Sequence, residues 1–420
     1  MRKSRVWPAV LGLENTVVED VEFDEDAEVL IVHARPVAKR RSRCGACGRR
    51  SPRFDHGAGR RRWRALDLGT VQAFVEADAP RVRCRTHGVT VASVPWARHD
   101  AGHTYAFDDQ VAWLATACSK TAVTELMRIA WRTVGAIITR VWADVDAVHD
   151  RFAGLSRIGI DEISFKRGHR YLTVVVDHDS GRLVWADPGR DKATLHGFFD
   201  ALEASGEGRC QAITHVSADG AEWIDAVVAE RCGNAVRCAD PFHVVRWATD
   251  ALDEVRRQAW NDARGGRRTG RASGHAKALK GARYALWKNP ENLTDRQQAK
   301  LAWVAKTDPR LHRAYLLKEG LRLVFQLPAD QAPYALDRWI GWARRCRIEP
   351  FVKLARTITK HRSSILAAIE HGLSNGLIEA VNTKIRLITR IAFGFRSPQA
   401  LIALAMLSRG GYRPVLPGRN

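Results

Sequence analysis

The chain has 420 residues, 45% of them hydrophobic, with 67 Lys plus Arg against 46 Asp plus Glu and a formal net charge of +21 at pH 7. This composition excludes a basic disordered chain, and the surplus of positive charge favours a polyanionic partner, nucleic acid first and an anionic membrane surface second. No apolar run approaches the roughly 18 residues that span a bilayer, and the N-terminus lacks a signal-peptide pattern, so we expect a soluble, cytoplasmic protein.

Residues 1–100 carry a basic stretch with a metal-binding pattern. Between Arg35 and Arg64 there are 12 Lys or Arg and a single acid. Three thiolates and an imidazole satisfy tetrahedral Zn²⁺, and this segment has two pairs of candidate ligands, each pair separated by two residues: Cys44 and Cys47, then Cys84 and His87. Residues 71–77, between the pairs, alternate like a strand. The sequence therefore predicts a β-rich zinc-binding domain, against the alternative of four unrelated residues.

Residues 101–150 change to helical spacing, with helices expected near 108–117, 121–129 and 131–142. Short junctions of small residues separate them, as in a helix-turn-helix. The third helix would then offer Arg132, Thr133 and Arg140 to DNA. An ordinary three-helix bundle is the alternative, and the basic zinc-binding segment beside it favours DNA binding.

Residues 151–248 alternate strands and helices. Three strands, near 157–165, 171–177 and 183–186, are joined by tight turns and should form an antiparallel meander. There follow a helix (192–204), a strand (212–217), a helix (222–231), a strand (235–238) and a helix that begins near 242. This order, βββαβαβα, is that of a ribonuclease-H-like fold.

Residues 249–372 have helical spacing without strand alternation, which indicates an all-α insertion. Between Arg264 and Arg283 there are seven Lys or Arg and no acid, so we expect a loop that faces DNA. Residues 373–420 would complete the core with a C-terminal helix. The predicted fold class is multidomain α/β, with an N-terminal β-rich zinc-binding domain, a helix-turn-helix, and a ribonuclease-H-like α/β core with an all-α insertion.

Two carboxylates of this core are candidate catalytic residues. Asp161 lies inside an apolar first strand, and Asp219 follows the fourth. Those strands are neighbours in a ribonuclease-H-like sheet, so two like charges would lie side by side, and a divalent cation resolves their repulsion. Asp240, after the fifth strand, is the competing ligand, although it lies one strand further from Asp161. Glu162 should point to the other face and is expected to be structural.

A third carboxylate, Glu379, lies in a helix near the end of the chain. The polar residues of that helix recur at steps of 4, 3, 4 and 4 and form one stripe, opposite an apolar stripe that would pack on the core: Asn375, Glu379, Asn382, Arg386 and Arg390. Acids from separate elements, beside cations that can hold phosphates, suit two-metal phosphoryl transfer with Mg²⁺ or Mn²⁺.

Taken in order, these segments resemble a DDE transposase of the bacterial ISL-three insertion-sequence family over nearly the whole chain. The resemblance includes the zinc pattern, the helix-turn-helix and four short motifs: Gly-Ile-Asp161-Glu, Ala-Asp219-Gly, Ala-Asp240-Pro-Phe-His243 and Asn375-Gly-Leu-Ile-Glu379. It implies a catalytic, Mg²⁺-binding triad of Asp161, Asp219 and Glu379. Supporting roles would go to Asp240, His243, Asn375 and Asn382. The family's usual Asp-Arg-Phe-His motif has Pro in place of Arg here.

The resemblance implies a transposase that binds the terminal inverted repeats of its own insertion sequence and then cuts and rejoins strands of double-stranded DNA. Bringing two ends and a target together implies at least a homodimer, which would act at the bacterial nucleoid and not at a membrane. Two alternatives stay open. A structure-selective nuclease of the same fold has little need for a sequence-reading module, and a non-catalytic DNA-binding regulator leaves the three acids unexplained.

Overall fold

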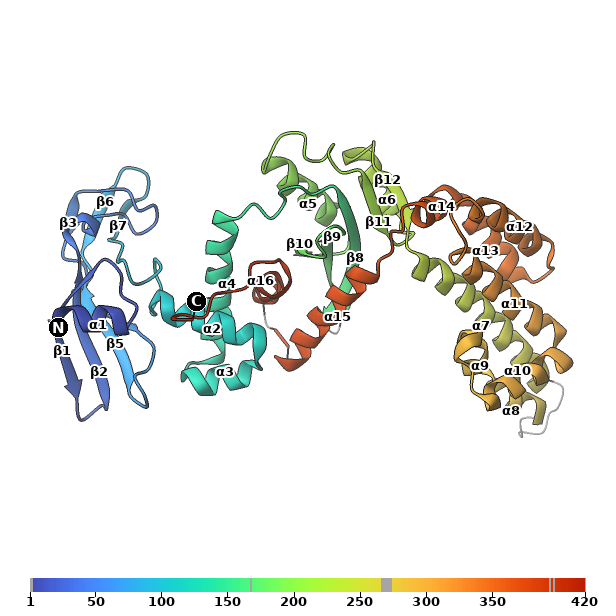
Figure 1. The fold of residues 1–420 in the computed structure, drawn as a ribbon, viewed down its shortest axis with the longest axis horizontal. Helices are drawn as coiled ribbons and strands as arrows, with labels where there is room; N and C mark the ends of the chain where they lie inside the picture. Colours follow the sequence, from blue (N-terminus) through green and yellow to red (C-terminus); the bar gives the residue numbers. More distant parts are fainter. Residues whose placement is uncertain (1–2, 167, 266–273, 393, 396, 420) are drawn as a thin grey trace. The chain divides into compact units, whose positions relative to one another are not determined.

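The structure is a computed structural model that describes residues 3–166, 168–265, 274–392, 394–395 and 397–419. The chain divides into two compact units, which Figure 1 colours along the sequence. The first comprises Met1–Asp150 and Leu387–Asn420, and the second comprises Arg151–Arg386. Within the described ranges, no helix is both long enough and apolar enough to cross a membrane.

The first unit begins with helix α1 (Lys3–Val10) and two small sheets. One sheet has the order β1-β2-β5-β4 and consists of β1 (Thr16–Asp24), β2 (Val29–Pro36), β5 (Gln72–Asp78) and β4 (Arg60–Arg64). The other has the order β3-β6-β7 and consists of β3 (Arg53–Asp55), β6 (Arg81–Cys84) and β7 (Gly88–Val91). Alternate residues of β5 are buried in a core with Trp63, as expected for a strand with one covered face. The predicted β-rich domain is confirmed.

Three helices follow, as predicted: α2 (Tyr105–Ala117), α3 (Lys120–Met127) and α4 (Trp131–Val148). The side chains of Thr104 and Ser119 accept hydrogen bonds from backbone N–H groups and cap the first turns of α2 and α3. Arg128 has a left-handed conformation (φ 51°) that ends α3 and begins the turn to α4. Their shared core includes Val123 and Val134, both fully buried.

Helix α16 (Pro398–Arg409) completes the first unit and packs on α2 and α4. A Cβ at Gly135 of α4 would lie 3.7 Å from the Cβ of Ala400, so the two helices are in direct contact. The predicted domain boundary gave all of residues 373–420 to the core, whereas the division into compact units places Leu387–Asn420 in the first unit. The physical reason is that α16 is strongly apolar and buries Leu401 and Leu404 within the first unit.

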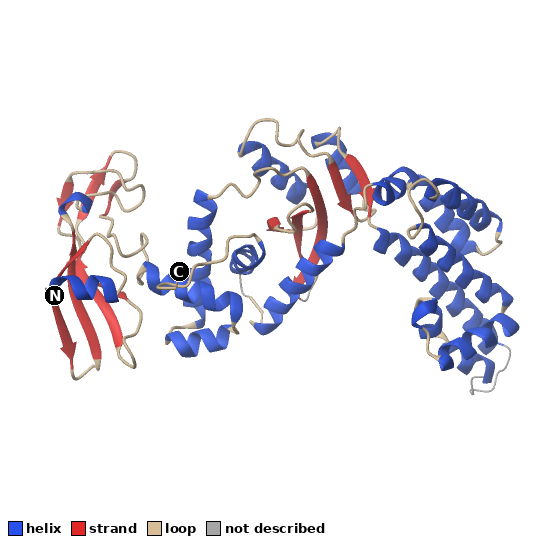
Figure 2. Cartoon of the chain, in the orientation of Figure 1, coloured by secondary structure: helices blue, strands red, loops and turns tan. Residues whose placement is uncertain are grey.

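The second unit contains a five-stranded sheet with the order β10-β9-β8-β11-β12. Figure 2 draws the strands of both units in red. Its strands are β8 (Arg157–Lys166), β9 (Arg170–Asp177), β10 (Leu183–Pro188), β11 (His215–Ala218) and β12 (Val236–Ala239). The first three form the predicted antiparallel meander, and β11 pairs in parallel with both β8 and β12. The first and fourth strands are therefore neighbours, as the ribonuclease-H-like interpretation required.

Helices cover both faces of this sheet. Helices α5 (Lys192–Ala204) and α6 (Glu222–Arg231) share a core with Ile158 and Ile160 of β8. Gly159 lies between those residues and faces the other way, toward α15 (Gly376–Ile391). A Cβ at Gly159 would meet Cδ1 of Ile378 at less than van der Waals distance, so a side chain at this position would force Ile378 or α15 to move. From Leu387 on, α15 belongs to the first unit.

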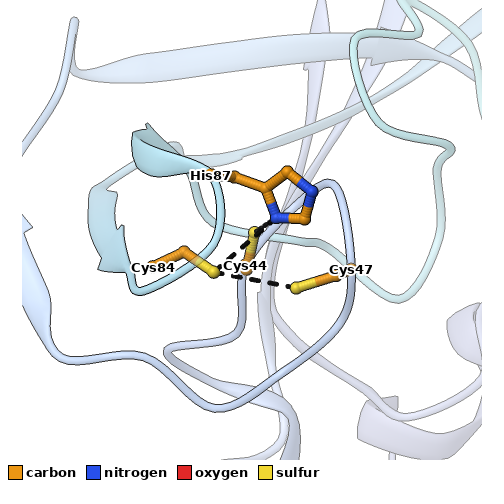
Figure 3. Close-up of side chains that lie close together, drawn as sticks. All are labelled: Cys44, Cys47, Cys84 and His87. Carbon is orange, nitrogen blue, oxygen red and sulfur yellow. Dashed lines mark hydrogen bonds between the residues drawn. The ribbon is translucent and has the colours of Figure 1, made fainter.

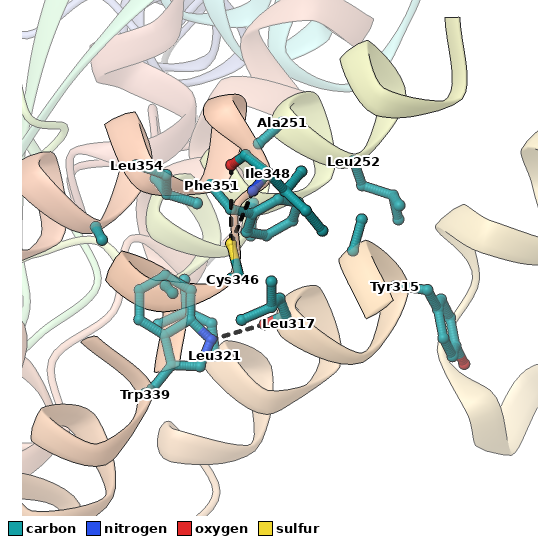
Figure 4. Packing of buried hydrophobic residues seen from close by; sticks show 14 of the residues in the cluster. Ala251, Leu252, Tyr315, Leu317, Leu321, Trp339, Cys346, Ile348, Phe351 and Leu354 are labelled. Carbon is teal, nitrogen blue, oxygen red and sulfur yellow. Dashed lines mark hydrogen bonds between the residues drawn. The ribbon is translucent and has the colours of Figure 1, made fainter. Parts of the chain in front are cut away.

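Helix α7 (Pro241–Gly265) runs from the end of β12 straight into the all-α part, whose predicted start at residue 249 falls inside it. The other helices are α8 (Gly274–Lys280), α9 (Arg283–Trp287), α10 (Asp295–Thr307), α11 (Pro309–Val324), α12 (Ala332–Arg345), α13 (Glu349–Lys360) and α14 (Arg362–Glu370). Trp339 lies in their core, where its Nε1 donates to the carbonyl of Leu317 at 2.7 Å (Figure 4). Residues 266–273 of the predicted basic loop lie outside the described residues.

Candidate metal centre and candidate active site

The four predicted zinc ligands come together in the first unit. The ligand atoms of Cys44, Cys47, Cys84 and His87 all lie within 4.8 Å of one another (Figure 3). Three separations are 3.7 Å: Cys44 Sγ to His87 Nδ1, Cys47 Sγ to Cys84 Sγ, and Cys84 Sγ to His87 Nδ1. Zn–S bonds of about 2.3 Å in a tetrahedron give S···S edges of about 3.8 Å. The four side chains therefore fit a structural zinc ion.

Two glycine turns shape this centre. Gly48 has φ +67° and its N–H donates to the carbonyl of Cys44 at 2.8 Å, which closes the first turn. Gly88 has φ +65° and pairs with Cys84 where β6 turns into β7. Both conformations favour glycine, and each turn returns the chain so that its two ligands face the same point.

The residues predicted to read DNA differ in what they contact. Arg132 is exposed and Thr133 half-buried in the first turn of α4. Arg140 instead donates from Nε and Nη2 to the carboxylate of Asp108, at 2.6 and 2.7 Å, and Asp108 is fully buried. Arg98 binds the same carboxylate at 3.2 Å. This ion pair gives Arg140 a structural role and leaves Arg132 and Thr133 as the predicted DNA contacts of α4.

In the second unit, three aspartates lie at or just beyond the ends of the parallel pairings of β8, β11 and β12. The parallel register pairs Ser217 with Gly159 and Ala218 with Ala239. Extended by the next residues, it sets Asp219 beside Asp161 on one side and beside Asp240 on the other, on the face that α15 covers. Neighbouring strands are about 4.8 Å apart, so this register indicates that the backbones of the three residues lie near one another at the ends of the paired segments.

Asp161 is a half-buried carboxylate with two hydrogen-bond donors. The side chain of Asn382 donates from Nδ2 to Oδ2 at 2.7 Å, and the backbone N–H of Glu162 donates to Oδ1 at 2.8 Å. Burial nonetheless raises the pKa of Asp161 above its ordinary value. The Oδ1 of Asn382 is buried without a hydrogen-bond partner among the described residues. A buried acid and an unpaired amide oxygen side by side are oxygen donors that suit a hard cation.

Glu162 projects toward Arg190, whose Nε donates to Oε1 at 3.1 Å. Burial raises the pKa of Glu162 above its ordinary value, and the charge of Asp219 adds to this effect. The ion pair with Arg190 suits a structural role, but Glu162 also lines a cavity that contains Asp161 and Glu379, so the structure does not set it apart from the candidate acids as expected.

Asp240 is occupied by contacts within the protein. Its carboxylate accepts hydrogen bonds from the backbone N–H groups of Phe242 and His243 at the start of α7, both at 3.3 Å, and from the N–H of Asn375 at 3.1 Å. It also binds Nδ1 of His243 at 2.6 Å. Burial opposes ionisation, but the hydrogen bonds from His243 and Asn375 hold the pKa of Asp240 below its ordinary value. The hydrogen bond to Asp240 raises the pKa of His243.

Asn375 joins this network to the sheet. It is 4% exposed, and its Oδ1 accepts from Oγ of Ser217 at 2.5 Å, while Ser217 contacts Nε2 of His178 at 2.7 Å. Asp240 and Ser217 therefore fix the start of α15 against the ends of β12 and β11. The sequence reasoning missed His178 and Ser217. Ser217 carried a usable signal, because it lies two residues before Asp219 and must share its face.

Glu379 is exposed on α15 and lines a cavity of about 460 Å³ together with Asp161, Arg246 and Arg386. The apolar stripe of α15 is buried as predicted, but Asn375 and Asn382 are buried too, so the expected polar stripe is divided. Arg390 lies in the part of α15 that belongs to the first unit.

Asp219 is not among the described residues that line this cavity, and its Oδ1 accepts from the N–H of Ala221 at 3.0 Å. Within the described part of the chain, the zinc centre is the one group of three or more Cys, His, Asp or Glu ligand atoms that lie within 4.8 Å of one another. The oxygens of Asp161, Asp219 and Glu379 are therefore more widely spaced than the zinc ligands.

Known transposase families and individual transposases match each part of the chain. Residues 40–87 match the zinc-finger of transposase IS204/IS1001/IS1096/IS1165, residues 92–142 the helix-turn-helix domain of transposase family ISL3, and residues 158–405 the transposase domain of the same family. The whole chain is 65% identical to a transposase for insertion sequence element IS1557 of Mycobacterium tuberculosis, over 98% of that protein. It is 27% identical to a transposase for insertion sequence element IS1001 of Bordetella parapertussis, over 95% of this chain and 96% of that protein. The chain therefore belongs to transposase family ISL3 and is a DNA transposase.

Proposed function

We propose that this transposase binds the terminal inverted repeats of its insertion sequence with the first unit and cuts and rejoins DNA strands with the second. The observation that carries the catalytic part is the parallel pairing of β8 with β11, which ends two residues before Asp161 and Asp219, on the sheet face covered by α15, the helix that bears Glu379. The zinc centre and the helix-turn-helix, in a basic first unit, support the binding part.

Asp161, Asp219 and Glu379 would hold Mg²⁺ or Mn²⁺. Such ions, when bound, activate a water or a 3′-hydroxyl for attack on the phosphate and stabilise the leaving oxygen. The buried Asp161 and the unpaired Oδ1 of Asn382 support this assignment, because both offer oxygen to a cation. Asn382 would orient Asp161 through its hydrogen bond to Oδ2.

Cations beside these acids would bind the DNA backbone. Arg246 and Arg386 line the same cavity as Asp161 and Glu379, and Arg390 lies one turn beyond Arg386 on α15. The guanidinium groups of Arg246 and Arg386 would hold phosphates on either side of the scissile bond, and Arg390, in the first unit, would bind the DNA backbone separately. In the first unit, Arg132 and Thr133 would contact base edges, and the wider surplus of Lys and Arg would give affinity that falls with salt.

The test uses the purified full chain and DNA that carries the element's own ends, with Mg²⁺, with Mn²⁺ and without either. We expect nicking at the element boundary that requires the metal and is absent in Asp161→Asn, Asp219→Asn and Glu379→Gln, while end binding stays unchanged. Asp262→Asn is the matched control, because this acid of α7 is exposed and is not among the residues that line the cavity. Cleavage that survives one of the three substitutions removes that residue from the site.

Three further outcomes would change the proposal. Tight end binding without cleavage under either metal supports a non-catalytic regulator. Cleavage of branched DNA irrespective of the end sequence supports a structure-selective nuclease. Because two ends have to be brought together, we also expect a homodimer or higher oligomer on end DNA, and light scattering that finds one chain per two-ended DNA would contradict it.

A further inference from the structure

Phe242 is an exposed aromatic residue in the wall of the cavity that Asp161 and Glu379 line. It is 59% exposed, whereas Phe198 and Phe199 of the same unit are fully buried. Burial of a Phe side chain stabilises a fold, so the exposed ring of Phe242 contributes little to stability at this position. The side chain lines the cavity that also contains Asp161, Glu379 and Arg246.

The position of Phe242 is fixed although its ring is exposed. Pro241 begins α7, and the backbone N–H of Phe242 donates to Oδ1 of Asp240 at 3.3 Å. The ring of His243 meets that of Phe242 edge to face, with centroids 5.9 Å apart and planes at 87°. Asp240 is itself 2% exposed and bound to Asn375. An aromatic ring held in this way loses little conformational freedom when a ligand stacks on it.

The chemistry around the ring matches that of a nucleotide. A flat apolar face beside cations that can hold phosphates is the combination by which proteins bind single-stranded nucleic acid, since every base has a face that can stack. Arg246 lies one helical turn from Phe242 on α7 and lines the same cavity. The cavity, at about 460 Å³, is in the range of sites for small ligands, roughly 300–1,000 Å³. It is thus of a size for a nucleotide and too small for a duplex.

We infer that Phe242 stacks on an unpaired base next to the phosphate that is cut. This inference rests on the proposed function and adds a base-binding position to it. The acids would hold the divalent cation at the reacting phosphate, Arg246 binds the neighbouring phosphate, and Phe242 stacks on the base between them. The base has to leave its pair to reach the ring, so Phe242 positions the strand and favours ends whose terminal pair opens easily.

The test compares Phe242→Ala, Phe242→Leu and Phe242→Trp with the wild-type full chain. Tyr334→Ala is the matched control, because Tyr334 is 69% exposed and lies on α12, away from the cavity residues. Stacking of one base is worth about 1–3 kcal/mol, which corresponds to roughly 5- to 150-fold in rate. We expect end cleavage to fall by this factor in the Ala and Leu variants and to stay within a few-fold of wild type in the Trp variant and the control.

A second readout does not need cleavage. End DNA with 2-aminopurine at each nucleotide flanking the cut is bound in Ca²⁺, and stacking should quench its fluorescence in the wild-type complex but not in the Phe242→Ala complex. Wild-type cleavage by Phe242→Leu, or equal fluorescence with wild type and Phe242→Ala at every position, overturns the inference. If the wild-type chain itself cuts no ends, the proposed function fails, and the fluorescence comparison still decides whether the ring stacks on a base.

Discussion

Gly159→Ala should separate the helix that bears Glu379 from the sheet. The added Cβ would lie 2.2 Å from Cδ1 and 2.9 Å from Cγ1 of Ile378, and 2.9 Å from Nε2 of His178. Ile378 is fully buried, so its side chain has little room to turn away. Overpacking of this kind costs about 1–3 kcal/mol. In a unit of this size, that corresponds to a fall of about 2–12 °C in the melting temperature.

The consequence for activity should exceed the loss of stability. If α15 moves outward, Asn382 loses its hydrogen bond to Asp161, and Glu379 moves away from the same cavity. We expect metal-dependent end cleavage to fall at least tenfold, while end binding by the first unit is unchanged. Calorimetry of the full chain measures the stability of each unit, since the two units need not unfold in a single transition.

Ile378→Val supplies the control for this reasoning. The substitution removes Cδ1 and by itself costs about 0.5–1.5 kcal/mol. Combined with Gly159→Ala, it should lose less stability than the two single changes added together, because the closest contact is gone. Strict additivity, or a Gly159→Ala protein with normal melting and normal cleavage, would refute the claim that a side chain at position 159 displaces Ile378 and α15.

Three further predictions concern other parts of the molecule. Cys84→Ser should lower the zinc content below one ion per chain and weaken end binding, because the centre shapes the β6–β7 turn; metal analysis and a binding titration measure this. Arg140→Ala should cost about 2–4 kcal/mol, since it leaves the buried carboxylate of Asp108 with fewer cations, and thermal unfolding of the first unit measures the loss. Folding raises the pKa of His243 and lowers the pKa of Asp240. The ion pair between them therefore contributes fully to the free energy of unfolding between pH 3.8 and pH 6.5, the ordinary pKa values of Asp and His. This contribution should decline as pH rises through the folded-state pKa of His243, and the difference in melting temperature between wild type and His243→Gln should therefore be smaller at pH 9 than at pH 6.

Each of these predictions has its own control. Cys210→Ser changes a buried cysteine outside the zinc centre and should keep full zinc content. Arg140→Lys keeps a cation near Asp108 and should recover part of the lost stability, whereas equal losses for Ala and Lys would mean that charge is not what matters there. A difference between wild type and His243→Gln that grows with pH would contradict the assigned pKa directions.

The sequence predicted the sheet well because its determinants are local. Alternation and turn signals located each strand, and the strand order then set Asp219 beside Asp161 without any information on side-chain contacts. Cys44 and its partners were predictable for a similar reason, because zinc ligands occur in close pairs whose spacing is visible in the chain.

The sequence could not indicate which side chains of distant elements bind one another. Arg140 had the appearance of a DNA contact, since the acid that binds it, Asp108, is 32 residues away on another helix. Asn382 showed its spacing relative to Glu379 but not its hydrogen bond to Asp161, 221 residues earlier. The role of Phe242 was hidden because an aromatic residue at a helix start is usually buried, and only its exposed fraction shows otherwise.

The place of α16 in the first unit has a consequence for synthesis on the ribosome. The sheets and helices α2 to α4 emerge first, yet the helix that covers part of α4 follows only after the whole second unit. At about 5–20 residues per second, translation of the intervening 151–386 takes roughly 10–50 s. During this interval the apolar surface of α4 that later contacts Ala400 is exposed to water. A chain whose synthesis stops before α16 leaves that surface exposed permanently. Truncated copies of the gene product should therefore aggregate or be degraded before they can occupy the ends of the element.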